Sequence, residues 1–274
     1  RMADIAAHSG LSYFLYQEAF DKTPSAEKIQ ELLEEHPEIT HVSMVHSETT
    51  SGILNDIAAA AKAVKEAGRI FIVDAMSSFG GVDIPVEELG IDYIISSANK
   101  CIQGVPGFSF IICSREELKK CEGQARSLSL DLYDQWKTME KDGKWRFTSP
   151  THVVLAFSQA LKEMEEEGGI PARHARYAEN NRILIEKMEE LGIRPYIEGP
   201  LQGSIITIFY YPEHAEFSFQ EMYQYIKERG YAIYPGKVTD ADTFRIGNIG
   251  EIYPEDMERL AQIIRDFLNE KKAA

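Results

Sequence analysis

The stretch "DYIISSANKCIQG", residues 92–104, joins a short apolar run to a single lysine. The run at 93–95 is typical of a buried strand, and the small polar residues after it predict where that strand ends. Lys100 comes directly after this end and has no carboxylate beside it in the sequence. The partners of this amine must therefore come from other parts of the chain.

The first half of the chain alternates strand-like and helical segments, as βαβ units do. Strands are predicted at 41–46, 69–75, 91–96 and 107–113, and helices at 26–36 and 55–68. The last three strand segments are nearly continuous apolar runs, which is typical of strands buried on both faces. In the second helix Asn55 is the predicted N-cap and Gly68 the predicted C-cap. The pattern predicts an α/β fold with a mostly parallel sheet.

After about residue 126 the pattern changes to long helices and then to a second set of short elements. Helices are predicted at 128–141, 151–167 and 170–191, followed by strands at 203–211 and 243–250 and by helices at 218–230 and from Pro254 onward. We interpret this as a smaller α+β domain. The predicted division is a large α/β domain at 1–168 and a small C-terminal domain with its connecting helix at 169–274.

Composition and charge exclude several classes of partner. The chain has 274 residues with 44 acidic and 29 basic side chains, a net charge of −15. Nucleic acid and anionic membranes are therefore not expected as partners. The acidic residues cluster in helical segments such as "ELLEEHPE" and "KEMEEEGG", which predicts a solvated surface. No apolar run is long enough to cross a membrane, and three cysteines without CxxC spacing favour the reducing cytoplasm.

Polar side chains gather where three predicted strands end. The strand at 41–46 runs into "SETTSGILN", the next ends in Asp74, and the third leads to Lys100. In open parallel sheets, binding and chemistry concentrate at the carboxyl ends of the strands. A lysine amine can form an imine with an aldehyde, and a carboxylate can keep a pyridine nitrogen protonated. Pyridoxal 5′-phosphate (PLP) chemistry needs both groups.

Five motifs then carry a resemblance to a known family. They are "HSETTSGILND", "VDAMSSFGG", "SSANKCIQGVPGFSF", "RFTSPTH" and "FRIGNIGE", in that order along the chain. Together they resemble the class V, fold-type I family of PLP-dependent aminotransferases. Within that family the closest resemblance is to the branch that moves the amino group of 2-aminoethylphosphonate to pyruvate, giving phosphonoacetaldehyde and L-alanine.

The resemblance implies a role for seven residues. Lys100 is the lysine that holds the cofactor and moves the proton, and Asp74 is the partner of the ring nitrogen. Thr49, Met76 and Asn99 occupy cofactor-contacting positions, Thr148 reaches the cofactor phosphate of the neighbouring subunit, and Arg245 binds the acidic group of each substrate. The family's sites lie between subunits, so a homodimer is expected. No metal is expected, because His46 and Glu48 lack further ligands.

Each residue also has a purely structural interpretation, and other functions remain open. Lys100 could be a solvated strand end, and Arg245 could pair with a surface acid. Asp74 could be a loop acid or a helix cap, Thr49 could satisfy turn backbone groups, and Thr148 could simply start a helix. Cys101 and His46 are expected to be packed side chains. A serine- or alanine–glyoxylate aminotransferase and a catalytically silent chain of the same fold are the alternatives. A cysteine desulfurase is less favoured, because no loop with a reactive cysteine is evident.

The resemblance also concerns the start of the chain. Members of this family carry a further segment before the position that matches Arg1, with a glycine-rich phosphate loop and an aromatic residue that stacks on the cofactor. The sequence is therefore expected to be N-terminally truncated relative to the family. Weak PLP binding is expected, since charge-assisted hydrogen bonds and aromatic stacking would be lost.

Overall fold

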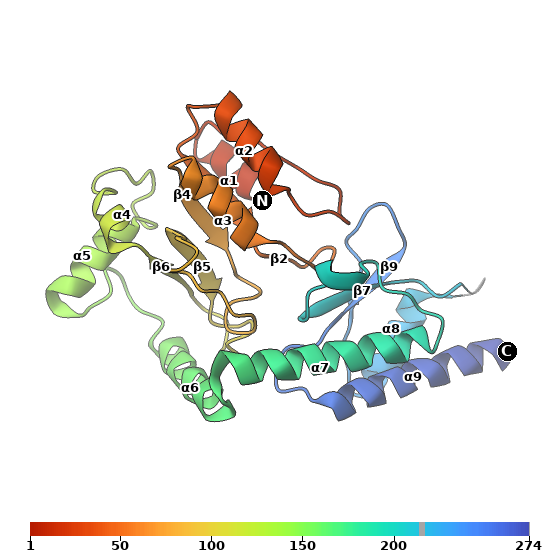
Figure 1. Ribbon diagram of the computed structural model, residues 1–274. Coiled ribbons are helices and arrows are strands. Elements are labelled where there is room, and N and C mark those ends of the chain that lie inside the picture. The colour runs from red at the N-terminus through yellow and green to blue at the C-terminus, as the bar shows by residue number, and fades with distance from the viewer. Residues whose placement is uncertain (214–216, 274) are drawn as a thin grey trace.

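The computed structural model describes residues 1–213 and 217–273, and its centre is a four-stranded sheet (Figure 1). The strands are β1 (His41–Val45), β4 (Ile70–Asp74), β5 (Tyr93–Ser97) and β6 (Ser109–Cys113), in the spatial order β1-β4-β5-β6. β1, β4 and β5 run parallel, whereas β6 is antiparallel to β5. The prediction of a mostly parallel sheet is confirmed.

Helices α2 (Ala26–Glu35) and α3 (Ile57–Glu66) cover one face of this sheet (Figure 1). Their apolar faces pack with β4 and β5, where Val64, Phe71 and Val73 have no exposed surface. Burial alternates along β4, so its second face is only half covered. This cluster forms the core beneath the strand ends.

Three local predictions were wrong. The N-cap of α3 is Asp56, whose side chain accepts a hydrogen bond from the Ala59 N–H, while the Asn55 side chain donates to the Val45 carbonyl oxygen. The C-cap is Ala67, one residue before the predicted Gly68. The third apolar run is not buried either: in β6 the side chains are exposed or half-buried. An edge strand has a neighbour on one side only, and its pattern alone does not reveal this.

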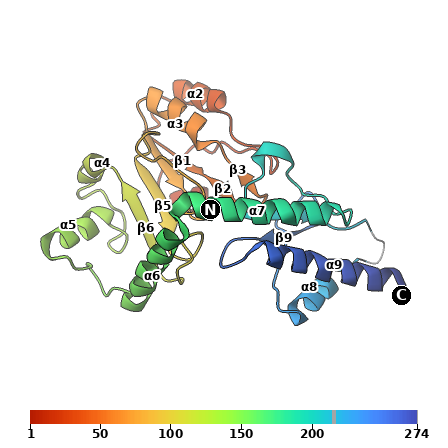
Figure 2. The same ribbon diagram turned by 60° about the horizontal axis from the view of Figure 1, so that its bottom comes forward.

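Long helices connect the central sheet to a second sheet. α4 (Arg115–Lys119), α5 (Leu132–Asp142), α6 (Thr151–Glu167) and α7 (Gly169–Glu189) follow β6 in order. The corner between α6 and α7 is made by Gly168 and Gly169, both with positive φ, a conformation that glycine adopts without strain. From this corner α7 runs beneath the molecule toward the second sheet (Figures 1 and 2).

The second sheet has the strand order β7-β9-β8 and is antiparallel. Its strands are β7 (Ile206–Tyr210), β8 (Tyr234–Pro235) and β9 (Thr243–Gly247), and it packs with α8 (Phe219–Glu228), α9 (Pro254–Ala273) and the second half of α7. Leu184, Phe209 and Phe244 are fully buried there. The smaller elements are α1 (Met2–His8), the hairpin of β2 (Ser47–Glu48) and β3 (Ile53–Leu54), and a 3₁₀ turn at Gly199–Leu201.

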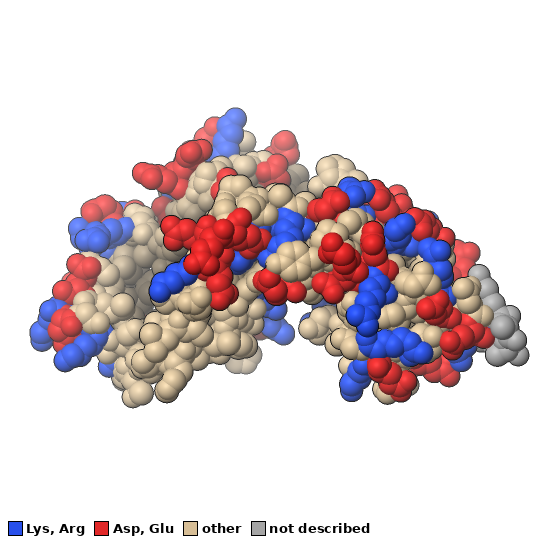
Figure 3. Space-filling view, turned by 90° about the horizontal axis from the view of Figure 1, so that it is seen from below, with Lys and Arg blue, Asp and Glu red and all other residues tan. Residues whose placement is uncertain are grey.

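The surface is charged on the side of α7 and α9 (Figure 3). Along α6 the charges gather in the second half, where residues 162–167 hold one lysine and four glutamates, whereas residues 151–161 hold no lysine, arginine, aspartate or glutamate. Large apolar side chains are exposed on and before α6, including Leu155 at 65% and Phe147 at 55%. Across the two described ranges, no helix combines the length and the apolar character needed to cross a membrane.

Candidate active site

The carboxyl ends of β1, β4 and β5 lie side by side. In the parallel register Asp74 is opposite Val45 on one side and Ile95 on the other. The pairing continues one residue further, because the His46 N–H donates to the Asp74 carbonyl oxygen at 2.9 Å. The loops that follow the three strands therefore leave the sheet at one edge.

The loop after Asp74 contacts the turn that carries Lys100. The Cys101 thiol donates to the Ser77 carbonyl oxygen at 3.1 Å, and the Ser96 hydroxyl donates to that of Ala75 at 3.3 Å. The Asp74 carboxylate accepts a hydrogen bond from the Met76 N–H at 3.0 Å. The predicted residues Asp74, Met76, Asn99 and Lys100 are all half-buried in this region. The amine and the carboxylate, 26 positions apart in the sequence, are thus on adjoining loops.

The Lys100 turn is tight and closed by two main-chain hydrogen bonds. The Gln103 N–H donates to the Lys100 carbonyl oxygen and the Gly104 N–H to that of Ala98, both at 2.8 Å. Gln103 has a φ of 66°, a left-handed conformation that is uncommon outside glycine. A Cβ at position 104 would lie 2.7 Å from the Ala98 oxygen, so the glycine is required. The turn therefore holds the lysine backbone in a defined place.

Arg245 reaches the same edge of the large sheet from β9. It is 7% exposed, and its Nη1 donates to the Thr49 carbonyl oxygen at 3.2 Å while its Nε donates to that of Pro235 at 2.9 Å. The guanidinium lies 5.7 Å from the centre of the Tyr234 ring. Burial lowers the pKa of Arg245, although a guanidinium stays charged in proteins. Within residues 1–213 and 217–273 no carboxylate forms an ion pair with it, which leaves a buried cation able to bind an anion.

The structure brings six of the seven predicted residues to this edge in two groups. Thr49 contacts Arg245, and Asp74, Met76, Asn99 and Lys100 lie on the adjoining loops. Thr148 is different. It is exposed in the segment between α5 and α6, and in the described part of the chain it has no hydrogen bond to the other six. Its predicted role involves a neighbouring subunit.

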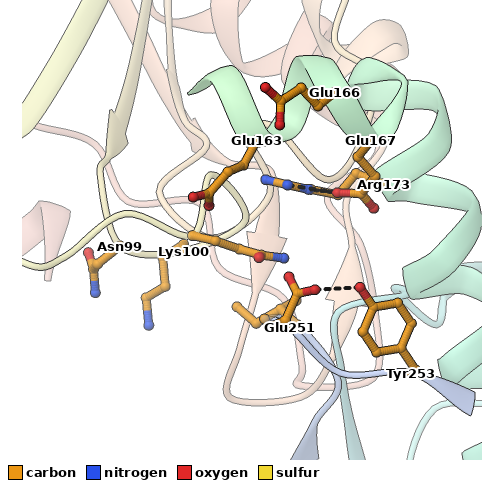
Figure 4. Close-up of a pocket in the computed structure, with 11 residues that line it drawn as sticks. Asn99, Lys100, Glu163, Glu166, Glu167, Arg173, Glu251 and Tyr253 are labelled. Carbon is orange, nitrogen blue, oxygen red and sulfur yellow. Dashed lines mark hydrogen bonds and ion pairs between the residues drawn. The ribbon is translucent and has the colours of Figure 1, made fainter. Parts of the chain in front are cut away.

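A cavity of about 850 Å³ touches the Lys100 turn from another side (Figure 4). Its lining is acidic and consists of Asn99, Lys100, Gln103, Glu163, Glu166, Glu167, Arg173, Ile249, Gly250, Glu251 and Tyr253. The Lys100 amine points away from Glu163 and Glu166 (Figure 4). Asp74, Thr49 and Arg245 do not line this cavity. Of the seven predicted residues, Asn99 and Lys100 belong to the lining of this cavity and the other five do not.

Two buried side chains near the strand ends, His46 and Cys101, keep one protonation state around neutral pH. The pKa of His46 is lowered to about 4 by burial, and its Nδ1 lies 2.9 Å from the Ser78 hydroxyl oxygen. Burial raises the pKa of the Cys101 thiol to about 12. The expectation that both residues are packed is confirmed. A neutral histidine and a protonated thiol cannot act as a cation or as a thiolate nucleophile here.

The sequence did not predict two arginines and a glutamate at the corner of α6 and α7. Glu167 pairs with Arg173 and Arg176, and Arg173 is 2% exposed. The clustering of acids in "KEMEEEGG" had predicted a solvated surface. A possible signal was the spacing of Arg173 and Arg176, which puts both on one face of a helix.

Comparison with known proteins agrees with this geometry. The family model "Aminotransferase class-V" matches residues 3–244. The chain belongs to this family. It is 54% identical to a 2-aminoethylphosphonate–pyruvate transaminase of Lysinibacillus sphaericus, over 98% of this chain and 73% of that protein. A protein of the same name from Bacteroides fragilis is 55% identical, over 97% of this chain and 74% of its own length.

Solved structures show the same fold at much lower identity. The ureidoglycine–glyoxylate aminotransferase of Bacillus subtilis superposes with a TM-score of 0.87 at 20% identity, over 98% of this chain and 70% of that one. The expected fold, that of the fold-type I PLP-dependent transferases, is thereby confirmed. As a class V aminotransferase the chain is a PLP-dependent enzyme.

The residues at the strand ends fit PLP. The cofactor needs an amine to hold its aldehyde carbon and a carboxylate for its ring nitrogen. Lys100 and Asp74 supply these groups from adjoining loops, and in the described residues neither takes part in an ion pair. Among the residues that the structure describes, the Asp74 carboxylate accepts a hydrogen bond from the Met76 N–H alone. Both groups are therefore available to a ligand.

Proposed function

We propose that this class V aminotransferase transfers the amino group of 2-aminoethylphosphonate to pyruvate, producing phosphonoacetaldehyde and L-alanine. The observation that carries the proposal is the buried Arg245 guanidinium beside Thr49, without an ion-pair partner in the described residues. An anionic substrate group would satisfy it. Relatives with 54% and 55% identity are named for these two substrates, which supports the choice of donor and acceptor.

The two half-reactions make the same demand on Arg245. The donor carries a phosphonate and the acceptor a carboxylate, and the planar guanidinium can donate two parallel hydrogen bonds to either group. One residue can therefore orient both substrates. The Tyr234 ring, 57% exposed and facing the guanidinium, would limit how the anion approaches.

Lys100 and Asp74 would act at the other end of the substrate. When bound, PLP supplies an aldehyde that exchanges amino groups and an electron-withdrawing ring. Lys100 would hold the cofactor and move a proton at the substrate carbon that bears the nitrogen. Asp74 would keep the ring nitrogen protonated, which favours electron withdrawal. Thr49, Met76 and Asn99 would line the cofactor from the neighbouring loops.

We further propose a cytoplasmic homodimer built from a large domain at 1–168 and a small domain at 169–274. Thr148 is exposed in the single chain. A residue that contacts the site of a neighbouring subunit has to be exposed in this way. Apolar side chains such as Phe147 and Leu155 are exposed around it, which is typical of a surface that binds another protein. The three cysteines are free, as expected in a reducing compartment.

The test is a donor-by-donor assay of the purified chain with added PLP. We expect 2-aminoethylphosphonate with pyruvate to give L-alanine and phosphonoacetaldehyde faster than alanine or serine reacts with glyoxylate. Equal or better rates with alanine or serine would favour the glyoxylate-type alternative. No turnover with any donor at saturating PLP, in a folded chain, would favour a catalytically silent one.

A further inference from the structure

Arg173, in the first half of α7, is a buried arginine to which the reaction proposed above gives no role. Arg173 is 2% exposed. Its Nη1 donates to the carbonyl oxygens of Cys101 at 3.0 Å and Ile102 at 3.2 Å. These two residues directly follow Lys100 and are themselves 0% and 1% exposed, so their carbonyl groups have no ready access to water. Arg173 is thus a principal hydrogen-bond partner of the lysine turn.

A carboxylate fixes this arginine from the other side. Arg173 donates from Nε and Nη2 to the same Glu167 oxygen, at 2.8 and 2.7 Å, beside the Lys100 turn (Figure 4). The other Glu167 oxygen accepts from the Arg176 Nε at 2.8 Å. Burial opposes the charged form of Glu167, but the hydrogen bonds from Arg176 and Arg173 outweigh it and lower its pKa. The carboxylate stays ionised and holds both guanidinium groups.

Arg176 holds the segment that follows the strand of Arg245. Its Nη1 donates to the carbonyl oxygens of Gly250 at 2.6 Å and Ile252 at 3.0 Å. Its guanidinium lies 5.1 Å from the ring centre of Tyr253. Glu167 therefore pairs with two arginines. Arg173 donates to the main chain that follows Lys100, and Arg176 donates to the main chain that follows the strand of Arg245.

We propose that Arg173 and Arg176 are positioning residues that act through the main chain, Arg173 on Lys100 and Arg176 on the strand of Arg245. Glu167 fixes the two against each other, which sets the distance between the amine and the substrate-binding guanidinium. This inference rests on the proposed function. A small displacement of a reacting group from its productive position lowers the rate steeply. The two arginines should therefore affect different kinetic constants.

The competing interpretation is an ion pair that only stabilises the corner of α6 and α7. In that case substitutions at either arginine would lower the unfolding temperature alike and leave the kinetic constants of the folded enzyme unchanged. Arg182 provides a matched control. It lies on α7 as well and is half exposed, and its ion pairs within the described residues are with Glu179 and Glu186 of the same helix.

The kinetic experiment uses the full chain with PLP and the variants Arg173→Gln, Arg173→Lys, Arg176→Gln and Arg182→Gln. For Arg173→Gln we expect kcat to fall roughly ten- to a hundredfold with KM for the donor changed less than about twofold. For Arg176→Gln we expect mainly a rise in KM. Arg173→Lys keeps the charge but not the planar fork, so an intermediate loss in kcat, about threefold or more, is expected. Arg182→Gln should match the wild type.

A spectroscopic measurement also distinguishes the variants of Arg173 and Arg176. The pH midpoint of the visible absorption band of PLP held by Lys100 should shift in Arg173→Gln and not in Arg176→Gln or Arg182→Gln. A stabilising ion pair alone would leave this midpoint unchanged. Equal kcat, KM and band position in Arg173→Gln and Arg182→Gln would overturn the proposal.

Amide hydrogen exchange of the chain without PLP separates this inference from the proposed function. The Gln103 and Gly104 amides, which close the Lys100 turn, should exchange faster in Arg173→Gln, and the 250–252 amides faster in Arg176→Gln. This pattern in an inactive wild type would support positioning while the proposed function fails. If Arg173→Gln does not fold, Arg173→Lys provides the test. An Arg173→Lys protein with the amide exchange and the kcat of the wild type would overturn the proposal.

Discussion

Arg245 and Thr49 are 196 positions apart in the sequence, and the arginine Nη1 donates to the threonine carbonyl oxygen at 3.2 Å. Thr49 lies in the hairpin turn that follows β1, and Asp74 ends the neighbouring strand β4. The contact therefore brings a cation of the second sheet to the carboxyl edge of the first. It explains how a substrate anion and a substrate amine could be bound at once by residues of two different sheets.

Arg245→Gln should weaken the binding of both substrates. Glutamine has no charge and cannot make two parallel charged hydrogen bonds to an anion. Since a hydrogen bond to a charged group contributes about 1.5–3 kcal/mol, KM should rise roughly ten- to a hundredfold for the donor and for pyruvate alike. Steady-state kinetics with each substrate varied in turn would measure this.

The control is Arg194→Gln, which removes an arginine that packs over the Tyr210 ring outside the proposed site. It should change neither KM by more than about twofold. A rise in KM for one substrate only would contradict a shared anion site at Arg245.

Lys100→Ala should abolish both cofactor capture and turnover. Without the amine, added PLP has no nitrogen at this position to bond with, and the proton at the substrate carbon has no acceptor. We expect no visible cofactor band and a kcat lowered by at least about a thousandfold, in the range of general acid–base catalysis. Lys62→Ala, which removes an exposed lysine of α3, should keep the wild-type band. A persisting band in Lys100→Ala would assign the cofactor to another amine.

The sheet was largely predictable because its central strands are dictated by local composition. The runs that contain β4 and β5 are apolar and end in polar residues, and the predicted helix α3 precedes β4, as expected for a strand parallel to β1. Residues 75–92, which join β4 to β5, form turns and no helix, and these two strands are parallel as well. β6 has a similar composition, yet it runs antiparallel to β5 and is exposed. Direction and burial depend on the connecting turn and on what covers a face, and neither can be deduced from the run itself.

The same limit applies to polar contacts. Asn55 and Asp56 are both good N-caps by type, and only the hydrogen bond from the Asn55 side chain to the Val45 oxygen decides between them. Glu167 looks like its acidic neighbours in sequence, but the corner after it turns it toward Arg173 and Arg176. Motif order predicts Lys100, Asp74 and Arg245 as site residues. It could not reveal the residues that hold their loops.

Leu155→Asp should weaken self-association. Leu155 is 65% exposed on α6, close in sequence to the exposed Phe147 and Thr148. A carboxylate in an apolar contact between subunits is desolvated without a partner, so the dimer dissociation constant should rise at least about tenfold. Analytical ultracentrifugation over a range of concentrations would measure it. Gln262→Asp, an exposed position on α9, adds the same charge elsewhere and should leave the dimer intact. A wild-type chain that is monomeric throughout would refute the dimer itself.

His46 should make the stability of the chain depend on pH. Burial lowers its pKa from 6.5 to about 4, so the folded state keeps the ring neutral while the unfolded state protonates it near its ordinary pKa. The unfolded state therefore binds more protons in this range, and the free energy of unfolding falls as the pH drops from 6.5 toward 4. At about pH 5 this residue alone should account for a loss of about 2 kcal/mol, from about 1.4 kcal/mol per pKa unit.

Urea unfolding of the wild type and of His46→Gln at about pH 7.5 and about pH 5 measures this loss. Glutamine has no charge to gain, so the variant should lose about 2 kcal/mol less stability than the wild type between the two pH values. Carboxylates contribute equally to both proteins and cancel in the comparison. His8→Gln, which removes an exposed histidine of α1, should behave like the wild type. Equal losses in the wild type and His46→Gln would show that the buried ring takes up its proton before the chain unfolds.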